Sequence, residues 1–136
     1  PTPPNAHWEH TLASLLIGWH ERSLRALHAH MYAVVQDRTM DIACFDRGVL
    51  RFVNRFEVEN HDDMMYYLLY VWKQLELDQR NDTLTLSAVA SVAFDLKEQL
   101  QTYLRDIRVE AIQTLYRADD RTATVGRLTV TPPTNT

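Results

Sequence analysis

The stretch that decides the fold runs from residue 49 to residue 77 and reads VLRFVNRFEVENHDDMMYYLLYVWKQLEL. Apolar residues alternate with polar ones as far as Val58, which is the period of a β-strand with one solvated face. After Asn60-His61-Asp62-Asp63 the apolar residues take a helical period from Met64 to Leu75. Asn60 or Asp62 is predicted to cap that helix, whose first turn favours aspartate. This joint between strand and helix predicts an α/β fold.

Two more strands are predicted upstream of this stretch. They run from His28 to Val35 and from Met40 to Phe45, ahead of the strand from Val49 to Val58. Asp46-Arg47-Gly48 predicts a hairpin turn in which Gly48 supplies a positive φ. The short connections predict a three-strand antiparallel meander. The residues expected on the inner face of its third strand are Leu50, Phe52, Phe56 and Val58.

Strands and helices alternate further along the chain. We predict a strand from Thr83 to Ser87, a helix from Val89 to Leu104 and a last strand from Ile107 to Leu115, with Arg108 and Glu110 facing outward. Helical crossovers normally join parallel strands. The sequence therefore predicts a mixed five-strand sheet with helices packed on it.

An amphipathic helix is predicted ahead of the sheet, from Trp8 to Leu27. A stripe of this kind needs a surface to cover, because a single amphipathic helix does not fold alone. We expect three regions, namely residues 1–27 as lead and helix, residues 28–116 as the sheet domain, and residues 117–136 as a flexible tail or edge strand. The apolar stripe of the helix consists of Leu12, Leu15, Leu16, Trp19, Leu24 and Leu27.

Composition limits the function. The net charge is −4 and no basic run occurs, which argues against nucleic acid or an anionic membrane as partner. Cys44 is the only cysteine and is interpreted as a small buried residue rather than a reactive thiol. With no disulfide, membrane-length apolar run or signal peptide, we expect a cytoplasmic protein. The chain begins at Pro1 rather than methionine, so we consider that an upstream half precedes it.

Phe56-Glu57-Val58 and residues 61–78 together resemble an uncharacterised bacterial family of unknown function, found mainly in Bacteroidetes. The most specific portion is Asp62-Asp63-x-x-Tyr66-Tyr67-Leu68-Leu69, and the likeness extends over residues 12–115. The resemblance implies the actin-like ATPase (ribonuclease H-like) fold of actin, hexokinase and Hsp70, whose lobes are a three-strand meander followed by alternating helices and strands. It also implies two lobes, of which this chain is the second, with the helix from Trp8 to Leu27 closing the first.

The nucleotide-binding members of that superfamily use glycines that this chain lacks. The resemblance places the phosphate loop at Gln36-Asp37-Arg38-Thr39 and the adenosine-binding turn at Ser87-Ala88-Val89-Ala90. A backbone that wraps closely around a phosphate needs glycine. We therefore interpret the chain as a pseudo-ATPase, a non-catalytic binding or scaffold module that acts through protein–protein contacts and holds no cofactor. The alternative is the passive lobe of a two-lobed nucleotide-dependent enzyme or switch.

Surplus apolar helix surface indicates where such contacts would lie. An aromatic stripe such as that of the second helix is more often core than interface, with its hydroxyl groups reaching the surface. The expected partner is a protein, either the upstream lobe or a second copy of this chain in a homodimer. The candidate interface residues are Trp8, Leu12, Leu16, Trp19, Tyr66 and Tyr70.

Two smaller clusters could carry chemistry. His28 and His30 share one face of a strand, with His20 as a third candidate metal ligand, but no further ligand falls in register. Asp62 and Asp63 could form a carboxylate pair, but helix capping explains both, and adjacent helix residues point about 100° apart. We therefore predict no metal site and no catalytic residue.

Overall fold

The computed structural model describes the backbone of residues 4–114 and 128–130 and the side chains of residues 12–112. The predicted order of elements is confirmed, and their boundaries shift by a few residues. The elements are α1 (Pro4–Ser23), β1 (Ala29–Gln36), β2 (Thr39–Asp46), β3 (Val49–Glu57), α2 (His61–Gln74), β4 (Thr83–Ala88), α3 (Ala90–Leu100), β5 (Asp106–Thr114) and β6 (Leu128–Val130). Apart from residues 128–130, the tail predicted for residues 117–136 lies outside the described residues.

The strands form one mixed sheet in the order β3-β2-β1-β4-β5-β6. β1, β2 and β3 are the predicted antiparallel meander. β4 lies parallel to β1, and β5 lies parallel to β4, because α2 and α3 carry the chain back across the sheet before each of them. β6 adds a short antiparallel sixth strand beside β5, where five strands were predicted.

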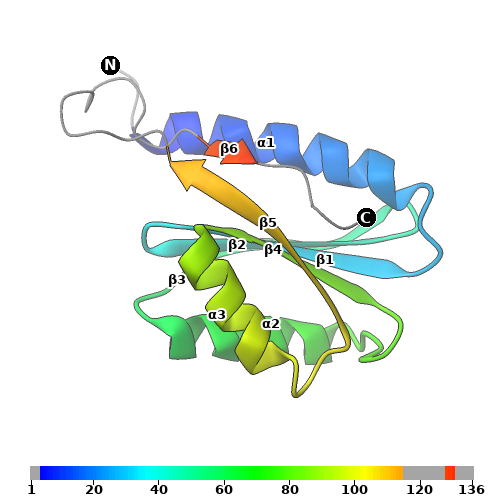
Figure 1. Cartoon of the computed structure of the whole chain (residues 1–136). Helices are drawn as coiled ribbons and strands as arrows, with labels where there is room; N and C mark the ends of the chain where they lie inside the picture. Colours follow the sequence, from blue (N-terminus) through cyan, green and yellow to red (C-terminus); the bar gives the residue numbers. More distant parts are fainter. Residues whose placement is uncertain (1–3, 115–127, 131–136) are drawn as a thin grey trace.

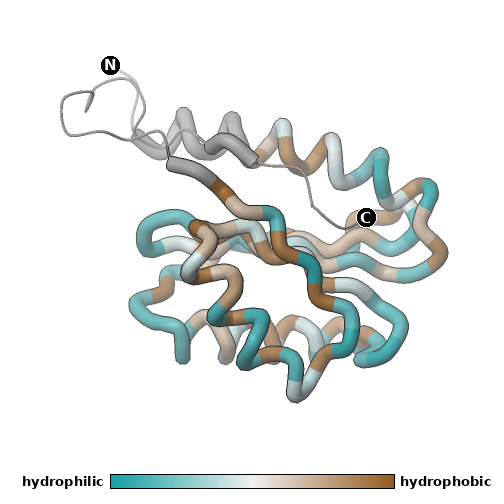
Figure 2. The backbone as a smooth tube through the Cα atoms, in the orientation of Figure 1, coloured by the Kyte–Doolittle hydropathy of each residue, from teal (hydrophilic) through white to brown (hydrophobic). Residues whose placement is uncertain are grey.

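Helices cover both faces of the sheet (Figure 1). α1 lies on one face, and α2 and α3 lie on the other. The larger core cluster lies between the sheet and α2 and α3, and a smaller cluster lies under α1. Polar segments gather at the turns (Figure 2). None of the helices in the described part of the chain has the length and apolar character that crossing a bilayer requires.

α1 packs its predicted stripe against its own sheet. Trp19 is 1% exposed and stacks on Tyr32 of β1, with ring centroids 4.5 Å apart. Leu12, Leu15 and Leu16 pack against the same cluster. The prediction was wrong for Leu24 and Leu27, which are 60% and 85% exposed, because the helix ends at Ser23 and the chain turns away toward β1.

α2 has a defined structure at both ends. Asn60 is the N-cap, and its Oδ1 accepts the Asp63 N–H at 2.8 Å, while Asp63 Oδ2 accepts the Glu59 N–H at 2.9 Å. At the C-terminus Glu76 has a φ of +55°, and its N–H donates to the Lys73 carbonyl at 3.0 Å. The Leu77 N–H donates to the Trp72 carbonyl at 3.2 Å, which completes a Schellman motif.

The stretch from Met64 to Leu75 is apolar on nearly all sides and so predicts a helix buried over most of its surface, which is only partly correct. The residues that α2 buries are Met64, Leu68, Val71 and Trp72. Tyr66 and Tyr70 are 62% and 49% exposed, so the helix is not buried on most sides. The helix packs on the sheet through one face, and the opposite face meets solvent even though it carries aromatic residues.

The prediction for β3 was wrong at Leu50. A β-bulge between Cys44 and Phe45 of β2 places Leu50 opposite Phe45, whose side chain lies under α1. The extra residue reverses the alternation, so Leu50 faces away from the larger core. The hairpin turn before β3 is confirmed, since Arg47 and Gly48 have φ values of +49° and +90°.

The middle of the sheet carries buried polar residues on the α1 side. Thr83, Thr85 and Ser87 of β4 are all buried. Glu110 of β5, which was predicted to face solvent, is 5% exposed. Arg22 of α1 donates to Glu110 Oε2 at 3.2 Å, so the helix that covers this face also supplies a counter-charge.

Candidate functional site

The two turns that correspond to the predicted nucleotide loops lie side by side, at the carboxyl ends of β1 and β4. β1 and β4 are parallel, with Val34 opposite Ser87, so the turn after β1 and the connection after β4 leave the sheet on one side. The β1–β2 turn holds Asp37 at a φ of +54°, a conformation that glycine adopts more readily. Thr39 Oγ1 donates to the Gln36 carbonyl at 3.0 Å and closes the turn on itself.

A shallow cavity of about 390 Å³ lies beside the β1–β2 turn. Arg38 and Thr39 line one side, and Glu57, Glu59 and Asp63 line the other. Three carboxylate residues face a single arginine here, so the lining does not favour a polyphosphate, which binds at sites rich in cations and backbone N–H groups. The β1–β2 turn beside this cavity also contains no glycine.

In the described part of the chain, β3 is paired on one side only, so its other edge is open. Aliphatic side chains stand exposed along it on the α1 side of the sheet. Val53 is 44% exposed, and Leu50 on the same side is also exposed, while Val49, opposite Asp46, is exposed on the other side. Ile17, on α1, is exposed as well. Open strand edges bordered by apolar side chains are typical sites of pairing with another chain.

The opposite side of the same edge carries a row of aromatic rings. Phe52 and Phe56 of β3 have ring centroids 6.4 Å apart, and Phe56 stacks on Tyr67 of α2 at 4.4 Å. Tyr66 meets Tyr67 edge-on at 5.3 Å and Tyr70 at 5.9 Å. The row continues from partly buried rings at β3 to exposed rings on α2, and with the exposed aliphatic residues of β3 it forms what we call the β3-edge surface.

The structure separates the predicted interface residues into two groups. Leu12, Leu16 and Trp19 pack against the sheet of their own chain, while Tyr66 and Tyr70 are exposed. The side chain of Trp8 lies outside the described residues.

The histidines do not converge on a metal site. His30 Nε2 lies 2.6 Å from Thr85 Oγ1, and its ring stacks on Tyr32. His28 lies near Thr83, and His20 donates to the Gly48 carbonyl at 3.1 Å. Burial, reinforced by the nearby Arg108 and Arg22, lowers the pKa of His30 to about 3. Among residues 12–112, no three His, Cys, Asp or Glu side chains are placed to hold a metal ion.

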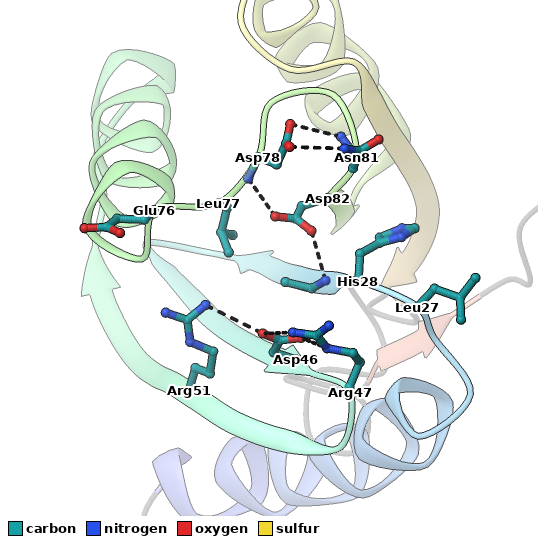
Figure 3. A pocket seen from close by; sticks show the side chains of 11 residues that line it. Leu27, His28, Asp46, Arg47, Arg51, Glu76, Leu77, Asp78, Asn81 and Asp82 are labelled. Atoms are coloured by element: carbon teal, nitrogen blue, oxygen red, sulfur yellow. Dashed lines mark hydrogen bonds and ion pairs between the residues drawn. The ribbon is translucent and has the colours of Figure 1, made fainter.

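A polar cavity of about 290 Å³ lies at the opposite end of the parallel strands (Figure 3). Asp82 is buried in its wall and accepts the N–H groups of Ala29 at 2.9 Å and Asp78 at 2.6 Å. Asp46 pairs with Arg47, Nε to Oδ1, at 2.7 Å. Asp82 thereby joins the start of β1 to the loop before β4, so this buried carboxylate has a structural explanation.

Cys44 is completely buried, and burial raises the pKa of its thiol to about 12. A thiol in that state is not a nucleophile, so the interpretation of Cys44 as a packing residue is supported.

A third cavity, of about 530 Å³, has a mostly apolar lining. It lies between the C-terminal end of α2 and the chain that follows α3. The sequence does not predict it, because no local pattern reports how far α2 stands from the chain that follows α3. The only sequence signal was a tryptophan, Trp72, in a helix that was otherwise expected to be core.

Comparison with known proteins agrees with this architecture. The chain is similar to a crystal structure from Bacteroides thetaiotaomicron, described as a protein with an actin-like ATPase fold and unknown function, with 37% sequence identity and a TM-score of 0.66. The similarity covers 70% of this chain and 37% of that chain, so this chain corresponds to little more than a third of that protein. No protein with a curated description is recognisably similar in sequence. The family described as "Protein of unknown function (DUF3822)" matches residues 3–107, and the chain belongs to that family.

Proposed function

We propose that this chain is a non-catalytic binding module with an actin-like ATPase fold, which acts through protein–protein contacts made by the β3-edge surface. The observation that carries the proposal is the open edge of β3 with exposed apolar side chains on both faces. Val53 stands on one face, and Tyr66 and Tyr70 on the other. Exposed apolar patches next to an open strand edge favour association.

The hydrogen-bonding pattern of β3 shows which backbone groups point outward. The Val58 N–H donates to the Arg38 carbonyl at 2.9 Å, toward β2. Because successive residues of a strand point their N–H and C=O groups to opposite sides, Val53, Arg55 and Glu57 present theirs to the open edge. The Arg55 N–H is held by Asn54 Oδ1 at 2.8 Å. Pairing with another strand would release that side chain and use the backbone groups instead.

A second copy of the chain fits this edge. In an antiparallel pair with its two-fold axis at Asn54, Phe52 of one copy stands opposite Phe56 of the other. Aromatic cross-strand pairs of this kind are stabilising. An axis at Val53 would instead place Phe52 opposite Asn54, so this aromatic pair would be lost. The register at Asn54 also brings the tyrosine rows of the two α2 helices toward one another, because Tyr67 stacks on Phe56.

The non-catalytic part of the proposal is supported by the two turns at the carboxyl ends of β1 and β4. Neither contains glycine, and Val89, the N-cap of α3, makes no side-chain capping bond. The carboxylates beside the β1–β2 turn add negative charge where a nucleotide would need cations.

Sedimentation equilibrium over a range of protein concentrations tests the proposal. We expect a dimer whose dissociation constant rises at least about tenfold in Val53→Lys, because a lysine on the open edge opposes strand pairing. Gln99→Lys, at an exposed position of α3, adds the same single positive charge and serves as the matched control. A wild-type chain that remains monomeric throughout, or equal dissociation constants for both variants, would contradict the proposal.

The second candidate function is the passive lobe of a two-lobed nucleotide-dependent enzyme or switch. This function is favoured because the β1–β2 turn and the β4–α3 connection lie together at the carboxyl ends of β1 and β4. A thermal-shift comparison with Mg-ATP and Mg-GTP, on this chain and on a longer natural form, distinguishes the two. A nucleotide at 100 times its dissociation constant adds about 2.7 kcal/mol of stability. Stabilisation of the longer form alone would favour the passive lobe, and none in either form would favour the binding module.

A further inference from the structure

The cavity between α2 and the chain after α3 has the size and lining of a small-molecule site. Its volume is about 530 Å³, within the usual range for ligand pockets. Leu69 and Trp72 of α2 form one wall, and Tyr103 and Leu104 form the other. It lies on the face of the sheet opposite α1 and shares no residue with the β3-edge surface.

Trp72 gives this cavity a specific polar requirement. The residue is 4% exposed and lines the cavity, yet its indole Nε1–H has no hydrogen-bond partner. No other side-chain nitrogen or oxygen among residues 12–112 is both buried and unpartnered. Buried N–H groups in folded proteins are almost always paired, so an unpaired one beside a cavity calls for an acceptor. A bound molecule with a carbonyl-type oxygen would supply it.

The rim indicates the charge of that molecule. Lys73 and Glu76 stand at the rim with Gln79, so one positive side chain is balanced by one negative one. A balanced rim gives no net attraction for either an anion or a cation, and the walls are apolar. The lining therefore suits a neutral molecule.

We propose that this cavity binds a small, neutral, mainly apolar molecule that carries one hydrogen-bond acceptor, and that Trp72 donates to the acceptor. Leu69, Leu104 and the ring of Tyr103 cover the apolar part. The Nε1 atom has almost no surface open to solvent, so an acceptor in the cavity reaches it only when the indole ring shifts. Binding is therefore accompanied by that shift. The resonance of that N–H reports the shift directly.

The test titrates ¹⁵N-labelled protein with acetophenone and, at equal concentrations, with ethylbenzene. Ethylbenzene has a methylene group where acetophenone has its carbonyl group, so it keeps the ring and the methyl group and lacks the acceptor oxygen. Trp72→Phe assigns the indole N–H resonance of Trp72 among the three tryptophans of the chain. We expect acetophenone to move that resonance downfield in a saturable way, and ethylbenzene to bind more weakly without a downfield shift.

Tyr103→Ser tests the cavity without altering the core, because Tyr103 is half exposed. Losing its ring should weaken acetophenone binding about three- to tenfold. Phe94→Ser removes an equally exposed ring of α3 that lines none of the three cavities, and should leave binding unchanged.

Three results would overturn the proposal. The first is an unmoved Trp72 resonance with both probes, and the second is equal binding of both, since the acceptor would then have no role. The third is that Tyr103→Ser abolishes self-association and leaves ketone binding intact, which would assign the cavity to a second copy of the chain.

Discussion

His30 stands between the Tyr32 ring and Thr85 on the α1 side of the sheet, where a positive charge is unfavourable. Burial is the main cause, and Arg108 and Arg22 add repulsion, so the pKa of His30 falls to about 3 from an ordinary value of 6.5. Between these two values the unfolded chain binds a proton that the folded chain does not. Stability is therefore greatest above about pH 6.5 and is lost as the pH falls toward 3.

This residue predicts a pH dependence of folding. Between about pH 7.5 and about pH 5, the wild type should lose about 2 kcal/mol more unfolding free energy than His30→Asn, which has no ring to protonate. Urea unfolding at the two pH values measures the difference. His20→Asn, which changes an exposed histidine, should lose as much as the wild type. Equal losses in the wild type and His30→Asn would show that His30 does not remain neutral.

Cys44 predicts an absence of thiol reactivity. Because its pKa is raised to about 12 and its side chain is completely buried, the native protein should not react with iodoacetamide at neutral pH. Mass spectrometry should find the adduct only under unfolding conditions, at a rate set by unfolding. Rapid labelling of the folded protein would mean that β2 opens locally or that the thiol is accessible.

At the scale of elements, the C-terminus of α2 carries a correctable strain. Glu76 is in the left-handed region with a φ of +55°, at the position of a Schellman motif that glycine usually occupies. Glu76→Gly should therefore raise the unfolding free energy by about 0.5–1 kcal/mol. Gln74→Gly, two residues earlier within the helix, should lower it by about 1 kcal/mol. Denaturant unfolding of the two variants checks both signs, and a destabilised Glu76→Gly would contradict this account of the turn.

Much of the fold was predictable because the elements have clear local patterns. The period change near Asn60, the hairpin glycine at Gly48 and the apolar stripe around Trp19 each specify a structure within a few residues. The misses arise where one residue alters the register or where distant elements decide the outcome. The bulge that turns Leu50 away interrupts no visible alternation, and the exposure of Tyr66 depends on how α2 sits on the sheet.

The candidate sites were less predictable than the fold. Tyr66 and Tyr70 were named from sequence, but the continuous row that joins them to Phe56 requires knowing that β3 is the edge strand. The sequence pattern of β5 predicts that Glu110 faces solvent, because it does not show that α1 places Arg22 beside this carboxylate. The cavity at Trp72 depends on the distance between α2 and the chain that follows α3, which no local sequence pattern reports.

At the scale of the whole molecule, the sheet has a middle that its own helices cover and a β3 edge that we expect another chain to cover. Its middle is occupied on both faces, by α1 on one side and by α2 and α3 on the other (Figure 1). Its β3 edge has apolar residues but no strand to pair with in the described part of the chain. Membership of the DUF3822 family and the actin-like ATPase fold describe the scaffold, while the β3 edge is where we expect its contacts.

The measurement that tests this central claim most directly is amide hydrogen exchange along β3 at increasing protein concentration. The N–H groups of Val53 and Glu57 point to the open edge and should exchange quickly in dilute solution. If a second copy adds its strand there, their protection should rise with concentration, while that of the inward Phe56 N–H stays constant. Concentration-independent exchange at Val53 and Glu57, with self-association evident by sedimentation, would place the contact elsewhere and contradict the account.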